Sequence, residues 1–115
     1  MVSKQISSGH GPRLLKLVRE TIGLRLGLVE KVDQSGLDGE VLNQDLATFI
    51  TLKKDGQLRG CIGNLEPTGP LLESLSQNAR HAAFNDHRFS PLSAEEFDQI
   101  LIDISILGRP VQLTY

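Results

Sequence analysis

The residues best suited to chemistry lie in one segment, Leu-Arg-Gly-Cys-Ile-Gly at positions 58–63, called the LRGCIG segment below. Its Cys61 is the only cysteine of the chain, and a thiol becomes a strong nucleophile when nearby positive charge or a histidine favours the thiolate. Arg59, two residues earlier, could supply that charge. Most free cysteines are instead small buried apolar side chains. Both interpretations of Cys61 are open on these residues alone.

Two glycines, Gly60 and Gly63, stand on either side of Cys61. Glycine inside a strand usually marks a bulge, or a close approach by another backbone or a ligand. On a regular strand Arg59 and Cys61 would share one face, whereas a bulge at Gly60 would separate them. The glycines therefore fit a ligand site, and they fit tight packing equally well.

A second group of polar residues, Asn78, Asp86 and Arg88, lies near the end of a predicted helix. Asn78 falls on the apolar side of that helix, so its amide must either cap a neighbouring backbone group or reach a ligand. Asp86 and Arg88 could form an ion pair that holds the loop, or Arg88 could contact an anion. Together with Arg59, Gly60 and Gly63, these three are the candidate ligand-binding residues, and Cys61 is the candidate catalytic residue.

Histidines could assist Cys61 or hold a metal. His81 and His87 could each act as a general base if their helix packs against the strand of Cys61, although an exposed helical histidine is more often ordinary polar surface. The three histidines and Cys61 show none of the CxxC or HxxxH spacings typical of zinc sites. The sequence therefore predicts no metal site, and it leaves the cofactor unknown.

Length and charge exclude several classes of function. A chain of 115 residues matches one domain, taken here as residues 1–115. Twelve basic residues against 14 acidic residues leave a net charge of −2, and only 4% of residues are aromatic, so neither DNA binding nor stacking on single-stranded nucleic acid is expected. The one basic cluster, Lys53, Lys54 and Arg59, fits a solvated hairpin edge better than an anion site.

Periodicity predicts an α+β fold with a mostly antiparallel sheet. Apolar residues at steps of three and four predict helices at about 12–31 and 70–85. Asp55-Gly56 is a strong hairpin signal and predicts two strands across 46–62, and nearly strict alternation predicts a further strand at 100–107. Between the second helix and that strand, Ser93 and Glu96 have the spacing of a capping box.

The apolar runs, the N-terminus and the cysteine content indicate the compartment of the protein. Its apolar runs are shorter than the ~18 residues of a membrane helix, and its N-terminus is unlike a signal peptide. A single cysteine fits a reducing compartment. We therefore expect a cytoplasmic protein with no membrane segment.

The pattern of motifs from about residue 14 to residue 107 resembles the AMMECR domain family, which is named for a human chromosomal region associated with Alport syndrome, midface hypoplasia and elliptocytosis. The resemblance is carried by the hexapeptide 58–63 and by pieces that follow it at matching spacing. They are Leu65-Glu66-Pro67, Pro70-Leu71, Asn78-Ala79, Ala82-Ala83-Phe84, Asp86, Arg88-Phe89, Pro91-Leu92 and Ile104-Ser105-Ile106-Leu107. His87 departs from the pattern, because the family usually has proline there.

The resemblance implies an α+β domain of two unequal subdomains with the hexapeptide near a cleft, in a family whose activity is not established. It implies a system with a Memo-type dioxygenase-like protein and a radical SAM protein as partners. Family members continue well past the strand at 100–107, so the chain resembles the domain without its C-terminal segment. We therefore expect the isoleucine face of that strand and a sheet edge to lack part of their usual cover, and the protein to associate with itself or a partner chain.

Two functions remain for the LRGCIG segment. In the first, a cleft holds a small anionic or nucleotide-like ligand against Arg59 and Arg88, and Cys61 acts as a nucleophile. In the second, the segment shapes a non-enzymatic surface for a protein or RNA, and Cys61 is structural. Whether the protein is an enzyme is left open by the residues.

Overall fold

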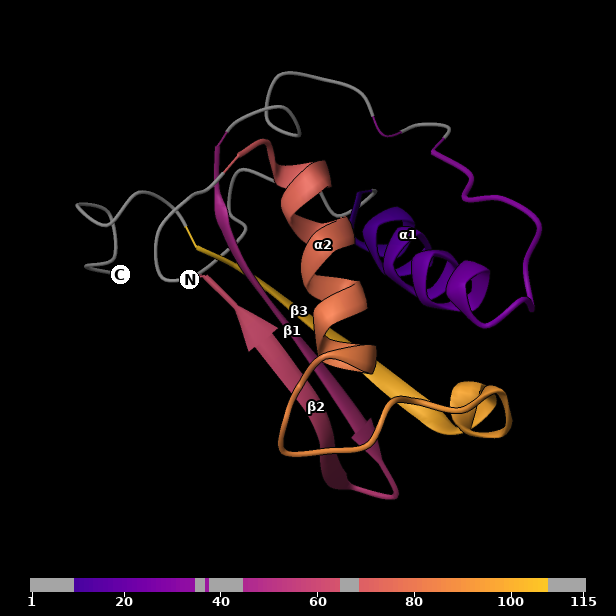
Figure 1. Cartoon of the computed structure of the whole chain (residues 1–115). Helices are drawn as coiled ribbons and strands as arrows, with labels where there is room; N and C mark the ends of the chain where they lie inside the picture. The colour runs from indigo at the N-terminus through magenta and orange to yellow at the C-terminus, as the bar shows by residue number, and fades with distance from the viewer. Residues whose placement is uncertain (1–9, 35–36, 38–44, 65–68, 108–115) are drawn as a thin grey trace.

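The computed structural model describes residues 10–34, 37, 45–64 and 69–107 (Figure 1). The elements in chain order are α1 (His10–Arg25), β1 (Ala47–Lys54), β2 (Gln57–Gly63), α2 (Leu71–Phe84), the short 3₁₀ helix η2 (Ala94–Gln99) and β3 (Ile100–Leu107). The strands form one antiparallel sheet in the order β2-β1-β3, and α2 lies across the face of the sheet with α1 beside it (Figure 1). The α+β fold, the hairpin and the last strand are confirmed.

Helix α1 ends at Arg25, earlier than the end near residue 31 that its apolar spacing predicted. Gly27 has a positive φ of 77° and its N–H donates to the Leu24 carbonyl at 3.1 Å, while the Leu28 N–H donates to the Gly23 carbonyl at 2.9 Å. This Schellman arrangement ends helices, and glycine adopts its left-handed conformation at little cost. None of the described helices is long and apolar enough to cross a membrane.

One face of the sheet packs against the helices. On β1 this face is formed by Thr48, Ile50 and Leu52, which are fully buried and pair with the alternate isoleucines of β3. Those isoleucines join the apolar core or pack against it. Helices α1 and α2 occupy this side, so Ile100 and Ile106 are buried, while Ile102 and Ile104 are half-buried.

The opposite face of the sheet, called the open face below, carries the alternate residues of each strand. Strand register arranges them in three rows: Leu58, Lys53 and Leu101, then Cys61, Thr51 and Asp103, then Gly63, Phe49 and Ser105. The first row is well exposed, with Leu101 67% and Leu58 43% accessible. This end of the open face therefore presents two exposed leucines, one on each side of a lysine.

Candidate functional site

Strand β2 is irregular at Arg59. Leu52 of β1 pairs with Gly60, whereas the next residue, Lys53, pairs with Leu58, so Arg59 is an extra residue between two paired ones. Such a bulge changes the direction of side chains along a strand. The side chain of Arg59 accordingly reaches η2, whereas Cys61 lies on the open face opposite Thr51. The predicted irregularity is therefore present, and it separates the arginine from the thiol.

The Arg59 guanidinium is held in bidentate fashion by one carboxylate. Its Nε donates to Glu96 Oε2 and its Nη2 to Glu96 Oε1, both at 2.9 Å, and the guanidinium side chain is only 12% exposed. Lys54 Nζ lies 3.1 Å from the same carboxylate, which also accepts the Ser93 N–H in the predicted capping box. Chiefly through the hydrogen bonds from Arg59, these partners hold the pKa of Glu96 well below its usual range.

This carboxylate makes the fold sensitive to acid. The pKa of Glu96 is lower in the folded protein than in the unfolded chain. The ionised carboxylate therefore adds to the free energy of unfolding at a pH above the usual glutamate pKa, and this contribution is lost as the pH falls below that pKa. We expect the free energy of unfolding to drop between about pH 4.5 and pH 2, and to drop less steeply in the Glu96→Gln variant. Urea unfolding at stepped pH measures both slopes, and equal slopes would contradict this role of Glu96.

Asp86 and Arg88 hold the outer edge of β2 at Cys61. The Cys61 N–H donates to Asp86 Oδ2 at 3.0 Å, and Arg88 Nη2 donates to the Cys61 carbonyl at 3.2 Å. The two side chains also bind each other, with Arg88 Nη2 2.7 Å from Asp86 Oδ2 and Arg88 Nε 3.0 Å from Asp86 Oδ1. The pair therefore supplies the donor and acceptor that a neighbouring strand would offer, and it protects this part of the sheet edge.

The Asp86 carboxylate is buried, with its side chain only 5% exposed. The side-chain hydrogen bond from Arg88 is the main reason that its pKa lies well below the usual aspartate range, and the Cys61 N–H lowers it further while burial acts in the opposite direction. Asp86 and Arg88 thus form an ion pair with each other in this loop.

Both glycines of the LRGCIG segment are required by packing. A Cβ at Gly60 would lie 2.2 Å from the Ala82 carbonyl oxygen, because the backbone of α2 approaches β2 closely there. A Cβ at Gly63 would lie 2.1 Å from the ring of Phe49 and 2.5 Å from the Thr48 carbonyl oxygen. The close approach expected at these positions comes from the chain's own helix and central strand.

Asn78 joins α2 to the ends of β1 and β2. It is 4% exposed, and its Nδ2 lies 2.8 Å from Thr48 Oγ1, 2.8 Å from Asn64 Oδ1 and 3.3 Å from the Thr48 carbonyl oxygen. The Thr48 hydroxyl also bonds Ser74 Oγ at 2.9 Å. The Asn78 amide therefore has partners within the chain, one of which is the backbone carbonyl of Thr48.

The Cys61 thiol is partly exposed on the open face. Among the described residues its hydrogen-bond partner is the Thr51 hydroxyl, 3.3 Å from the sulfur. His81, one of the two candidate bases, instead contacts the Asn85 side-chain amide through Nδ1 at 3.0 Å. Cys61 and Thr51 therefore meet, and Asp86 and Arg88 hydrogen-bond the backbone N–H and carbonyl of Cys61.

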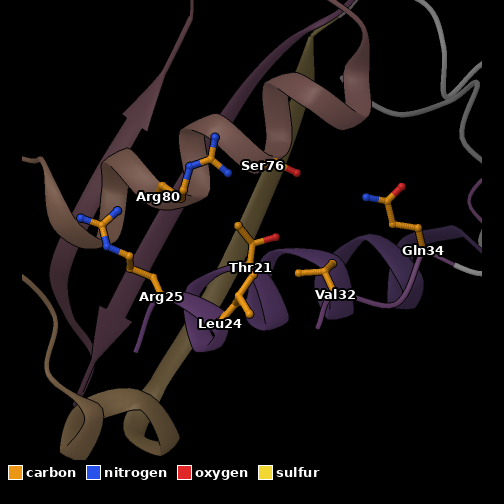
Figure 2. Close-up of a pocket in the computed structure, with 7 residues that line it drawn as sticks. All are labelled: Thr21, Leu24, Arg25, Val32, Gln34, Ser76 and Arg80. Carbon is orange, nitrogen blue, oxygen red and sulfur yellow. The ribbon is translucent and has the colours of Figure 1, made fainter. Parts of the chain in front are cut away.

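Sequence reasoning did not predict a cavity of about 440 Å³ between α1, the segment after it and α2 (Figure 2). Two arginines, Arg25 and Arg80, line it, together with the polar and apolar side chains of Thr21, Leu24, Val32, Gln34 and Ser76. The sequence signal that could have indicated this cavity is spacing, because polar residues four apart share one face of a helix. They are residues 21 and 25 on α1, and residues 76 and 80 on α2.

Comparison with known proteins places these features in a family. A family model described as AMMECR1 matches residues 15–115. A protein of Sulfolobus acidocaldarius is 39% identical over 108 residues, which are 90% of this chain and 47% of that protein. A protein of Methanothermobacter thermautotrophicus is 37% identical over 108 residues, which are 94% of this chain and 56% of that protein.

A solved structure is also similar. The crystal structure of an uncharacterised protein from Pyrococcus horikoshii superposes with a TM-score of 0.81 at 30% identity, and the match covers 92% of this chain and 55% of that one. The chain thus spans about half the length of the relatives that it matches.

Proposed function

The chain belongs to the AMMECR1 family, and we propose that it acts as a protein-interaction module through the open face of its sheet, with Cys61 as a structural part of that face. The observation that carries the proposal is the row of Leu58, Lys53 and Leu101, in which one exposed leucine lies on each side of a lysine. Exposed apolar groups clustered on one face mark interaction sites.

The ion pairs at and beside the LRGCIG segment favour this function over an anion-binding cleft at the same place. Arg59 is bound in bidentate fashion by Glu96, and Arg88 by Asp86. A ligand anion would have to displace these carboxylates, which are close, well aligned and partly or fully buried. The segment is therefore better suited to shape a surface than to hold a small anion.

A second copy of this chain is the partner that the open face fits. Its charged residues in the described rows are Lys53 and Asp103, which lie side by side with 3.5 Å between Nζ and Oδ2 and are 48% and 61% exposed. A surface with one cation beside one anion is complementary to itself under a two-fold rotation, because each lysine then meets the aspartate of the other copy. The leucines of the first row would be buried between the copies.

The size of the face predicts a weak dimer. Three strands of seven or eight residues, spaced ~4.8 Å apart with ~3.3 Å per residue, offer roughly 400 Å² per copy. Stable complexes bury about 800 Å² per partner, so this interface falls in the transient class. We expect a dissociation constant on the order of 100 μM.

Sedimentation velocity over roughly 10–500 μM tests this dimer, a range that brackets the expected dissociation constant. The wild-type protein is expected to shift from monomer toward dimer as concentration rises. Leu101→Asp should weaken the dimer by about tenfold or more, because it removes a buried apolar contact and sets two carboxylates side by side.

Leu28→Asp is the matched control, since Leu28 is 50% exposed but lies on the turn after α1. It introduces the same charge outside the open face and should leave the association unchanged. A wild-type protein that stays monomeric throughout the range, or an equal effect of the two substitutions, would refute the proposal.

A further inference from the structure

The cavity between the two helices has features of a ligand site that the open face lacks. It is formed by α1, the segment that follows α1, and α2, and its volume of about 440 Å³ suits a small organic molecule (Figure 2). In the view of Figure 2 the guanidinium groups of Arg25 and Arg80 lie at one end, Gln34 lies at the other, and Leu24 and Val32 lie between them.

The two arginines of this cavity differ in their partners from Arg59 of the LRGCIG segment and from Arg88, which contacts that segment. Within residues 10–34, 45–64 and 69–107, neither Arg25 nor Arg80 has a carboxylate within 4.0 Å, whereas Arg59 and Arg88 each have one. The guanidinium carbon of Arg25 lies 5.4 Å from the centroid of the Phe84 ring, a cation–π contact. Two positive charges thus line one cavity, and no carboxylate of the described residues forms an ion pair with either.

Two acidic side chains near the cavity have partners of their own. Glu20 and Asp33, which neighbour lining residues in the sequence, are both paired with Lys16, at 3.9 Å and 2.9 Å. Glu20 Oε1 also accepts the Asp33 N–H at 2.8 Å. Neither carboxylate therefore forms an ion pair with Arg25 or Arg80, and Lys16 offsets part of their charge.

We propose that this cavity binds a small phosphate monoester, with the phosphate held by Arg25 and Arg80 and the organic group against Leu24 and Val32. A phosphate dianion matches the charge of two guanidinium groups, whose planar forks bind phosphate oxygens in pairs. The apolar side chains give a carbon-containing ligand an advantage over inorganic phosphate. This site is on the helix side of the sheet, so it is independent of the proposed dimer.

Phenyl phosphate is the probe, added to the ¹⁵N-labelled full chain while amide signals are followed by NMR. Signals of residues 21–25, 32–34 and 76–80 should shift together and saturate, and those of 59–63 should not. Inorganic phosphate should bind about tenfold more weakly, since it lacks the ring, and phenol should bind more weakly still, since it lacks the charge.

Arg25→Gln and Arg80→Gln should each weaken phenyl phosphate binding by about tenfold or more, through loss of a charge-assisted hydrogen bond. Lys53→Gln removes the same charge on the open face and should bind as the wild type does, as should the dimer variant Leu101→Asp. Saturable shifts centred on 59–63, no shifts at the cavity, or equal weakening by all three charge substitutions would overturn the assignment. Because the wild-type shift map needs no variant, it decides the question even if an arginine variant folds poorly.

Discussion

Replacing Gly60 with alanine is expected to destabilise the domain by ~3 kcal/mol or more. The new Cβ would lie 2.2 Å from the Ala82 carbonyl oxygen and 3.2 Å from its carbonyl carbon. Both are backbone atoms of α2, so no side-chain rotation relieves the contact, and the helix must move away from β2. Urea unfolding followed by circular dichroism measures the loss.

Gly69→Ala is the control for that experiment. A Cβ at Gly69 meets no atom within 4 Å, so this substitution should change the free energy of unfolding by less than about 0.5 kcal/mol. If Gly60→Ala were as mild as Gly69→Ala, the close approach of α2 to β2 would not exist in solution. The packing explanation of the LRGCIG glycines would then be lost.

Asp86→Ala should destabilise the domain by roughly 3 kcal/mol. The substitution removes the acceptor of the Cys61 N–H and leaves the Arg88 guanidinium without its carboxylate at the edge of β2. Because Arg88 is largely exposed, most of the cost comes from the buried hydrogen bonds of Asp86 rather than from the lost ion pair. Thermal and urea unfolding give the difference from the wild type.

The control for Asp86 is Asp98→Ala, since Asp98 is an exposed residue of η2. Its replacement should leave stability within about 0.5 kcal/mol of the wild type. Hydrogen exchange adds a local readout, because the Cys61 amide should exchange faster in Asp86→Ala and should be unaffected in Asp98→Ala. A slow-exchanging Cys61 amide in Asp86→Ala would show that this edge is held by other contacts.

The fold was largely predictable because its signals are local. Asp55-Gly56 specifies the hairpin through the positive φ values that its turn requires, 54° at Asp55 and 77° at Gly56. Alternation along β3 and the Ser93–Glu96 capping box likewise depend on residues a few positions apart. The end of α1 was placed too late because apolar residues continue with helical spacing beyond Gly27, where the chain leaves the helix.

The partners of the site residues were not predictable, since they lie far away in the sequence. Glu96, which pairs with Arg59, is 37 residues from it in the sequence. Thr48, which accepts a hydrogen bond from Asn78, is 30 residues from Asn78. Composition around Arg59 suggests an available cation, and only the fold shows that it is already paired. The same holds for Arg25 and Arg80, which the packing of α1 on α2 brings to one cavity.

The most direct test of the proposed interface is the alkylation rate of the native protein as a function of its own concentration. Cys61 is the only thiol and lies in the second row of the open face, so the signal has one source at the surface in question. The rate should fall as the concentration rises from about 10 to 500 μM, because the dimer covers the thiol, and it should stay constant in Leu101→Asp. A wild-type rate that does not change with concentration would show that no dimer covers the open face.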